Sequence, residues 1–398
     1  MKKYDFLILG AGIFGITTAI ELRKKKYAVA IINPDKIPHP LAESTDISKI
    51  IRMEYGSDEE YMDMAIECIR IWKEWNELFH DQLYHETGFL LLSQSPFDDQ
   101  SKSFEAASYY NLLKRGYKPQ RIKSGDLAKH FPIFNHRVYK DGFYHSVGGY
   151  AESGRVVETL TKYAMQLGVD VYEGQIAEEI IVVNNNAEGV KTREGKRFNA
   201  GNIIVCAGNL TPFLVPDLKP YMRITGHPVF HLQPEQTDLF TYPQFTVFAA
   251  DISQTGWYGF PLHPKEKVIK VANHGIGLEI KNPELDERVV YEKDIEDLRR
   301  FLKDSIPALA NSPIVYTRRC CYTDTLDGHF WIDRHPEIEG LTIGSGGSGH
   351  GFKMGPVLGE MIAAVAEGET HKWSARYRWR HIDSNIKIQE EARFKIKA

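Results

Sequence analysis

The N-terminal segment opens with a short apolar run, continues with a run that is apolar on one helical face, and returns to a second apolar run. Residues 4–9 and 28–32 are short and apolar, which is typical of buried strands. Residues 16–23 carry Ile16, Ala19 and Ile20 at helical spacing. We therefore predict a strand–helix–strand unit at the start of the chain.

The rest of the chain mixes helical periodicity with short apolar runs. Residues 222–322 are dominated by strand signals and predict a mainly antiparallel sheet, whereas residues 44–52 and 148–150 indicate a loop and a turn. Apolar positions at helical spacing predict helices over 61–79, 103–116, 153–168, 291–302 and 355–367. Short apolar runs predict strands at 87–92, 169–172, 180–183, 189–192, 202–209 and 341–343. The pattern indicates an α/β fold with a doubly wound part and an interleaved α+β part.

A glycine motif joins the first predicted strand to the first predicted helix. Residues 10–15 read G-x-G-x-x-G. In this context Gly10 permits a tight turn, Gly12 lets the backbone approach a pyrophosphate, and Gly15 lets helix and strand pack closely. The helix N-terminus would face the phosphates with free N–H groups and its dipole. The motif predicts a dinucleotide cofactor but does not distinguish NAD from FAD.

The ribose contact departs from the usual pattern of such motifs. An acidic residue is expected at the end of the second strand, and this chain has Asn33 there, with Asp35 two positions on. Either side chain can accept a hydrogen bond. What holds the ribose therefore stays open.

A second glycine-rich loop lies near the other end of the chain. Residues 344–353 contain five glycines and end at Lys353, directly before a predicted helix. A glycine loop at a helix N-terminus suits an anion, and the lysine adds a full positive charge. Two such sites, one near each end of the chain, suit one cofactor with two anionic ends.

Lys270 and His274 lie four residues apart in a predicted strand. Strand alternation places Ile269 and Val271 on one face and Lys270 on the other, with His274 beside Lys270 if the strand continues. A Lys–His pair beneath a cofactor would do chemistry, whereas the same pair on a solvated sheet face would do none. The spacing alone favours the second interpretation.

The composition of the chain argues against some classes of function. The chain has 398 residues, 49 basic and 53 acidic, with a net charge of −4, which argues against a dedicated nucleic-acid binder. The basic, aromatic tail at 371–398 is interpreted as docking on the body of the protein. Residues 227 and 231 are histidines too far apart along a strand to share a metal, so no metal is expected.

The cysteines and the ends of the chain are used to predict the cellular location of the protein. Four cysteines without a C-x-x-C spacing do not make a disulfide scaffold, and Cys68 and Cys206 are interpreted as packed side chains. No stretch reaches the roughly 18 apolar residues of a membrane span. The chain does not close on an SKL-type signal. We expect a cytoplasmic protein with no membrane partner.

With these motifs in view, the sequence resembles the D-amino-acid-oxidase-type flavoproteins. It is most similar to the branch of monomeric sarcosine oxidases and pipecolate and saccharopine oxidases, with amadoriases as near relatives. The resemblance covers nearly the whole chain. It is carried by residues 10–15, 50–52, 55–56, 86–88, 258–261, 270 with 274, 320–323 and 349–353.

The resemblance implies roles for individual residues. Cys320 matches the cysteine that bonds covalently to the flavin 8α-methyl group in this branch, with the adjacent Cys321 as the alternative. Arg52 and Lys353 match the pair that holds the substrate carboxylate, and Lys270 matches the lysine near flavin N5 that assists dioxygen reduction. Further candidate active-site residues are Tyr258, His274, Tyr322 and Lys49. Position 49 is arginine in sarcosine oxidases, and lysine there resembles amadoriases and saccharopine oxidases. The candidate FAD-binding residues are Gly10, Gly12, Ile13, Phe14, Gly15, Asn33, Ser44, Ser48, Ile50, Cys206, Gly208, Cys320, Gly349, Gly351, Phe352 and Lys353.

The resemblance also implies a domain division and an activity. A discontinuous FAD-binding domain takes residues 1–85, 150–220 and 322–398, and a substrate domain takes 86–149 and 221–321. The expected enzyme is a monomeric FAD-dependent oxidase that converts the C–N bond of an N-substituted amino acid to an imine while dioxygen becomes hydrogen peroxide. Open alternatives are a deglycating fructosyl-amino-acid oxidase, a dehydrogenase with another electron acceptor, and a non-catalytic flavoprotein.

Overall fold

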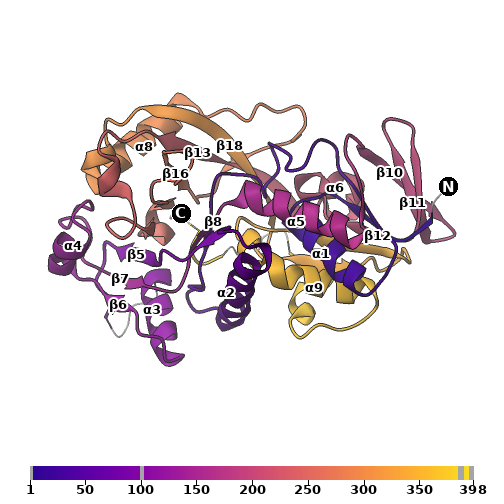
Figure 1. Ribbon diagram of the computed structural model, residues 1–398, viewed down its shortest axis with the longest axis horizontal. Helices are drawn as coiled ribbons and strands as arrows, with labels where there is room; N and C mark the ends of the chain where they lie inside the picture. The colour runs from indigo at the N-terminus through magenta and orange to yellow at the C-terminus, as the bar shows by residue number, and fades with distance from the viewer. Residues whose placement is uncertain (1–2, 99–102, 384–389, 394–398) are drawn as a thin grey trace.

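The computed structural model describes residues 3–98, 103–383 and 390–393, which form two large sheets with helices packed around them (Figure 1). The first sheet has eight strands, in the order β10-β11-β12-β1-β2-β9, with β20 on β12 and β19 on β20. β1 lies parallel to β12 and β2, and β12 lies parallel to β20. The strands of this sheet are β1 (Lys3–Leu9), β2 (Val29–Ile32), β9 (Asp170–Tyr172), β10 (Ala177–Val183), β11 (Asn186–Thr192), β12 (Arg197–Val205), β19 (Trp331–Arg334) and β20 (Leu341–Ser345).

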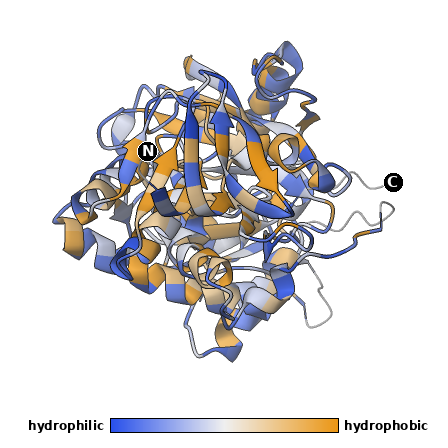
Figure 2. Ribbon diagram, turned by 90° about the vertical axis from the view of Figure 1, so that its right-hand side faces the viewer, coloured by the Kyte–Doolittle hydropathy of each residue, from blue (hydrophilic) through white to orange (hydrophobic). Residues whose placement is uncertain are grey.

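The central strands of this sheet are buried on both faces, which explains their continuous apolar runs. Ile8 joins the core cluster on the helical side of the sheet, and Leu7 and Leu9 join the cluster on the other side. Figure 2 shows hydrophobic positions concentrated on strands and helices, with hydrophilic positions on the outer turns. The predicted strand–helix–strand unit is confirmed.

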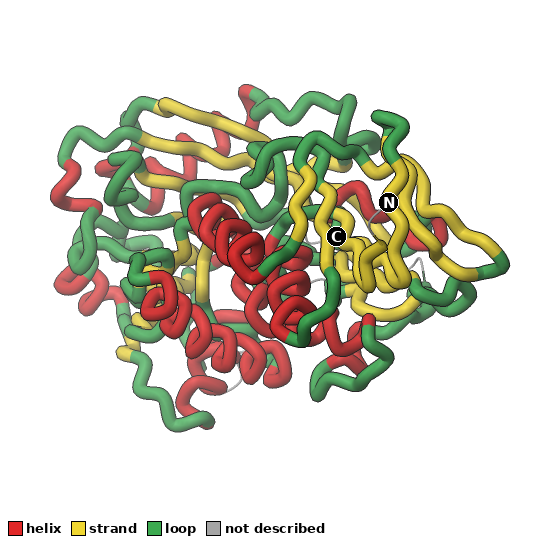
Figure 3. Tube along the Cα trace, turned by 45° about the vertical axis from the view of Figure 1, so that its right-hand side comes forward, coloured by secondary structure: helices red, strands yellow, loops and turns green. Residues whose placement is uncertain are grey.

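Helices cover one side of the first sheet, beside its strands in Figure 3. α1 packs against both α5 and α9, and α2 packs against α9. α5 ends where Gly168 takes a left-handed conformation with φ of 94°, as the sequence indicates. Among the described residues, no helix is long and apolar enough to cross a membrane. The helices are α1 (Ile13–Lys24), α2 (Glu59–Phe79), α3 (Phe104–Lys114), α4 (Ser124–His130), α5 (Ser153–Leu167), α6 (Thr211–Leu214), α7 (Ile252–Thr255), α8 (Glu292–Ser305) and α9 (Gly355–Ala366).

The second sheet has nine strands and is antiparallel except where β14 lies parallel to β5. Its order is β17-β13-β16-β15-β14-β5-β7-β6, and the long β18 also pairs with β13. The expected antiparallel sheet is therefore present, and the parallel pair is an addition that short apolar runs cannot reveal. Its strands are β5 (Phe89–Ser93), β6 (Gln120–Arg121), β7 (Asp141–His145), β13 (Met222–Leu232), β14 (Val247–Ala250), β15 (Trp257–Gly259), β16 (Ile269–Asn273), β17 (Leu278–Glu279) and β18 (Ile314–Thr325).

A small third sheet corrects two sequence predictions. Its strands are β3 (Lys49–Ile51), β8 (Gly149–Ala151) and β4 (Tyr84–His85), in the order β3-β8-β4. The predicted loop at 44–52 therefore ends in a strand, and the predicted turn at 148–150 runs into another. Strands of two or three residues are too short to show a period, and only pairing between distant segments forms them.

The described part of the C-terminal tail docks on the body of the protein. Tyr377 is fully buried, and Trp373 and Trp379 are partly buried against the two core clusters. The interpretation of the tail as a docked segment is confirmed over residues 371–383. Residues 384–389 and 394–398 lie outside the described part of the chain.

Candidate active site

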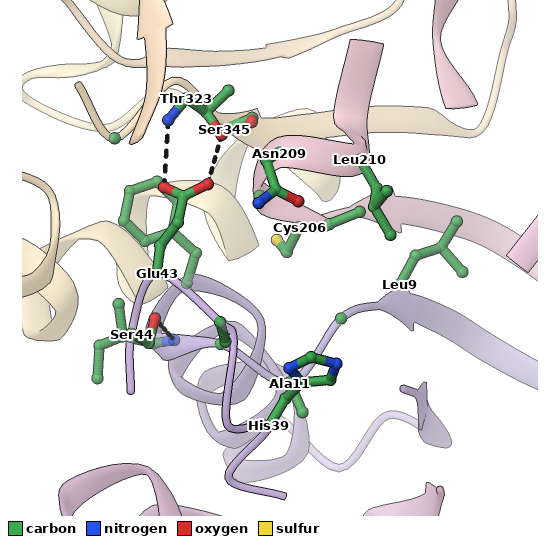
Figure 4. Close-up of a pocket in the computed structure, with 18 of the residues that line it drawn as sticks. Leu9, Ala11, His39, Glu43, Ser44, Cys206, Asn209, Leu210, Thr323 and Ser345 are labelled. Atoms are coloured by element: carbon green, nitrogen blue, oxygen red, sulfur yellow. Dashed lines mark hydrogen bonds between the residues drawn. The ribbon is translucent and has the colours of Figure 1, made fainter. Parts of the chain in front are cut away.

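A cavity of about 380 Å³ lies at the glycine loop between β1 and α1. The loop contributes Gly10, Gly12, Ile13 and Phe14, and Asn33 lies at the end of β2. Figure 4 shows the labelled side chains converging on this space from several segments of the chain. The other predicted cofactor residues that line it are Ser44, Cys206, Gly208, Gly349, Gly351 and Phe352.

Gly10 and Gly15 have the local roles in the turn and in helix packing that the sequence predicts. Gly10 has φ of +100°, and a Cβ added there would lie 2.5 Å from the carbonyl oxygen of Cys206. A Cβ at Gly15 would lie 2.0 Å from the carbonyl oxygen of Gly10, so Gly15 serves the packing of helix against strand and does not line the cavity.

Asn33 and Ser44, which also line the cavity, hold the glycine loop through hydrogen bonds to its backbone. The Asn33 Oδ1 accepts a hydrogen bond of 3.1 Å from the backbone N–H of Ala11. The Ser44 Oγ accepts one of 2.9 Å from the N–H of Ile13, at the start of α1. Both side chains therefore fix loop geometry, a role that sequence spacing did not indicate.

Glu43 is a partly buried glutamate in the cofactor cavity, which the sequence did not single out. It accepts hydrogen bonds from the Thr323 Oγ1 (2.5 Å) and the Thr323 N–H (3.3 Å), drawn as dashed lines in Figure 4. Burial raises the pKa of Glu43 to about 6. Nothing around it in the sequence sets it apart from an ordinary loop glutamate.

A smaller cavity of about 80 Å³ adjoins the first. Lys49, Tyr322, Gly349 and Phe352 line both cavities and so mark the boundary between them. The small cavity also brings together further predicted active-site and FAD-binding residues, which lie on or next to β3, β15, β16, β18 and the second glycine loop. They are Ile50, Arg52, Tyr258, Lys270, His274, Cys320 and Lys353.

Lys270 and His274 face this cavity rather than solvent. Both are nearly fully buried, which corrects the interpretation of a solvated sheet face. The Lys270 Nζ donates to the Asp46 Oδ2 (2.7 Å) and to the Ser48 carbonyl oxygen (2.6 Å). Burial lowers the pKa of Lys270 to about 8, although the charge of Asp46 opposes this shift. Ser48 itself lies outside the residues that line either cavity.

Arg52 and Lys353 lie at the same small cavity. The Arg52 guanidinium is 6% exposed and packs over the rings of Tyr55 and Phe104, with its Cζ 4.9 Å and 5.3 Å from the ring centroids. The Lys353 Nζ donates to the Tyr55 hydroxyl (3.1 Å) and to the His350 carbonyl oxygen (3.2 Å). Burial and the charge of Arg52 lower the pKa of Lys353 to about 7. Two cationic side chains therefore converge on one small space.

Glu390 completes the wall beside Arg52, although it lies 338 residues later in the chain. Its Oε1 lies 2.7 Å from the Arg52 Nη2, and its Oε2 lies 3.2 Å from the His274 Nε2. Sequence reasoning missed Glu390 because it stands in a tail that reads only as basic and aromatic.

The two adjacent cysteines point in opposite directions from β18. Cys320 lines the small cavity, and its Sγ accepts a hydrogen bond of 3.6 Å from the Arg318 Nη2. Cys321 packs into an apolar cluster with Ile224 and Ile280, and burial raises its pKa to about 12. Strand alternation therefore separates two residues that the sequence could not rank.

The first sheet has a parallel centre that presents a glycine cradle beside a charged cavity, which is typical of dinucleotide-dependent oxidoreductases. Residues 5–365 match the family described as FAD dependent oxidoreductase (DAO), and the chain belongs to this family. The cavity fits the cofactor of the family, because the two glycine loops leave open the space that side chains would fill. A Cβ at Gly347, which lines this cavity, would meet no atom nearer than the Glu43 Oε2 and the Phe14 ring, both 3.9 Å away.

Named relatives extend over nearly the whole chain. L-saccharopine oxidase from Schizosaccharomyces pombe is 28% identical, over 96% of this chain and 94% of that protein. Peroxisomal sarcosine oxidase from Homo sapiens is 27% identical, over 90% and 91% of the two chains. The fold is also that of the fructosamine oxidase Amadoriase II from Aspergillus fumigatus, with a TM-score of 0.81 and 24% identity over 97% and 91% of the two chains. The protein thus has the family's FAD-binding part and a second part built on a sheet.

Proposed function

We propose that this protein is an FAD-dependent oxidase of the C–N bond in an N-substituted amino acid. The observation that carries the proposal is the small cavity, where Arg52, Lys353 and Lys270 meet at the border of the cofactor cavity. Saccharopine and sarcosine, the substrates in the relatives' names, are both secondary amines that carry a carboxylate. A non-catalytic flavoprotein has no need for three buried cations at one place.

Arg52 and Lys353 bind and orient the substrate carboxylate. A guanidinium matches a carboxylate geometrically, and the Lys353 ammonium adds a second charge in a site from which water is largely excluded. FAD supplies the hydride acceptor that no side chain provides. With the carboxylate fixed, the carbon that bears the nitrogen is held in one orientation, which is the entropic part of catalysis.

Lys270 serves the oxygen half of the reaction. Its ammonium group stabilises the negative charge that develops on dioxygen as it takes up electrons. In sum, the substrate loses a hydride and a proton to become an imine, and dioxygen takes two electrons and two protons to become hydrogen peroxide. Water then hydrolyses the imine. Asp46 and the Ser48 carbonyl oxygen hold the Nζ in place for this role.

Cys320 is the proposed covalent tether of the cofactor. Its sulfur faces the small cavity, and the Arg318 guanidinium donates a hydrogen bond to it. Cys320 would hold the flavin through a thioether to its 8α-methyl group, and dioxygen would accept the two electrons released as the thiol proton and a methyl hydride are lost. Cys321 faces the apolar cluster and is not suited to this step.

The two large sheets suggest a division between cofactor binding and substrate binding. The first sheet carries the glycine loop and serves the cofactor, and the second carries Lys270, Tyr258 and Cys320 and serves the substrate. We keep the division at 1–85, 150–220 and 322–398 against 86–149 and 221–321 as part of the proposal. We further propose that the protein is a cytoplasmic monomer that acts on a small molecule and dioxygen.

Anaerobic bleaching of the flavin absorbance tests the proposal. The substrates are sarcosine, pipecolate, proline, saccharopine and a fructosyl amino acid, each mixed with the purified holoenzyme. Rapid bleaching by at least one of the first four is expected, followed by reoxidation in air with stoichiometric peroxide. Bleaching by the fructosyl compound alone would identify a deglycating oxidase. Bleaching without reoxidation in air would identify a dehydrogenase, and no bleaching at all would overturn the proposal.

A further inference from the structure

The carboxylate of Glu390 lies at the place where the proposed function requires the carboxylate of the substrate. Its side chain is 5% exposed and lines the small cavity together with Arg52, His274 and Lys353. Each of its two oxygens has a partner, the Arg52 Nη2 at 2.7 Å and the His274 Nε2 at 3.2 Å. The carboxylate of Glu390 thus contacts Arg52, the residue proposed to bind the substrate carboxylate.

The position of Glu390 is fixed by a buried anchor three residues on. Arg393 is 2% exposed and forms a two-pronged ion pair with Asp324, at 2.6 Å and 2.7 Å. Its Nε also donates to the Gly275 carbonyl oxygen at 2.9 Å, one residue after His274. Arg393 therefore anchors the segment from which Glu390 reaches the wall of the cavity.

The contact with Glu390 uses only one of the two terminal nitrogens of the Arg52 guanidinium. Its Nη2 is taken by Glu390, whereas its Nη1 is buried and has no hydrogen-bond partner among the described residues. A buried, unpartnered N–H group costs free energy, so Nη1 is a ready donor for a ligand. Burial works against ionisation of Glu390, but the neighbouring groups His350 and Arg52 hold its pKa well below the usual range. Glu390 thus stays an anion at neutral pH.

We propose that Glu390 is a specificity-determining residue, which occupies one edge of Arg52 and thereby limits the affinity of the site for carboxylates. The ligand carboxylate then meets the Nη1 edge and Lys353, beside a fixed negative charge. Substrates with a single carboxylate and a neutral or basic substituent on nitrogen are favoured over substrates that bring a second carboxylate to this place. The inference rests on the proposed function, which assigns Arg52 to the substrate carboxylate.

Equilibrium binding to the holoenzyme tests the inference without turnover. Methoxyacetate is an oxygen analogue of sarcosine that has no oxidisable amine, and methoxyacetamide is its uncharged counterpart. Their Kd values are measured from the change in the visible flavin spectrum. Glu390→Gln should bind methoxyacetate roughly ten- to a hundredfold more tightly than the wild type, because a nearby negative charge is removed. Methoxyacetamide should bind equally to both.

Two further variants control for structure. Glu391→Gln changes the neighbouring carboxylate, which contacts Ser57 at the protein surface, and should leave both Kd values unchanged. Glu390→Asp keeps the charge but withdraws it by one methylene group, and should bind methoxyacetate with intermediate affinity. It serves in place of Glu390→Gln if that variant does not fold.

Unchanged or weaker binding of methoxyacetate by the Glu390 variants would overturn the inference, as would an equal gain for the amide. Failure of the proposed function is seen separately. If no secondary amino acid bleaches the flavin, the oxidase assignment fails, whatever the carboxylate affinities are. If bleaching succeeds and Glu390→Gln leaves the affinity unchanged, only the inference fails.

Discussion

The Lys270 Nζ lies 2.7 Å from the Asp46 Oδ2, and the two residues are 224 positions apart in the chain. Their side chains are 3% and 4% exposed. Burial raises the pKa of a carboxyl group, yet the charges of Lys270 and Arg318 hold the pKa of Asp46 well below its usual range. Asp46 in turn opposes the loss of charge that burial imposes on Lys270. Asp46 thus favours the charged form of the buried Lys270.

Asp46→Asn should shift the pH dependence of dioxygen reactivity to lower pH. Without the Asp46 charge, the pKa of Lys270 falls below its present value of about 8, so the cation is lost at a lower pH. Reoxidation of the reduced enzyme, followed by stopped flow, should then decline at a lower pH than in the wild type. Identical pH profiles would contradict the role of the pair.

Lys270→Met should slow reoxidation by roughly a hundredfold, which is the usual effect of removing one preorganised charge-stabilising donor. Anaerobic reduction of the flavin by substrate should stay within about twofold of wild type, because that step develops no charge on dioxygen. Lys267→Met, at an exposed position of the same segment, is the matched control. Equal slowing of both half-reactions would argue that Lys270 acts on the substrate instead.

Carboxylate affinity should fall as the pH rises through about 7. Lys353 is protonated and cationic below its pKa of about 7 and neutral above it, so a ligand carboxylate loses one partner on the alkaline side. The Kd of methoxyacetate, measured between roughly pH 6 and 9, should rise most steeply near the free-enzyme pKa. In Lys353→Met this step should disappear. A wild-type profile that is flat over the range would contradict the role of Lys353.

The flavin should remain attached to the denatured wild-type chain. Cys320→Ser should release it completely on denaturation, because the sulfur at the cavity is lost, whereas Cys321→Ser should retain it. Flavin fluorescence of the protein band after denaturing electrophoresis measures the attachment. Retention in Cys320→Ser together with loss in Cys321→Ser would reverse the assignment.

Arg393→Met should destabilise the protein by about 3–5 kcal/mol, because it leaves the buried Asp324 carboxylate without its partner. The double variant Arg393→Met/Asp324→Asn should recover part of this loss, since no unpaired charge then stays buried. Thermal unfolding of the holoenzyme measures both, with Arg334→Met at an exposed position as the control. A single variant as stable as the control would show that this anchor contributes little.

Local signals were sufficient for the cofactor half of the protein. The strand, the glycine motif and α1 follow one another in the chain, so short-range geometry alone places Gly10, Gly12 and Phe14 beside one cavity. The order of Cys320 and Cys321 was invisible until β18 was seen as a strand, because a segment rich in charged residues does not show a clear period of two. The third sheet was missed for a similar reason, since its strands exist only through pairing.

The sequence by itself determined the fold class and a dinucleotide-binding motif, and its resemblance to a known family indicated FAD and the residues proposed to bind a carboxylate and to assist dioxygen reduction. The dinucleotide motif is contiguous, so its geometry is set by neighbouring residues. Only the tertiary structure decided that Asp46 holds Lys270, that Glu43 lies in the cofactor cavity, and that Glu390 shares Arg52. A buried ion pair depends on where two distant segments meet and how far water is excluded there, and neither is encoded in local spacing.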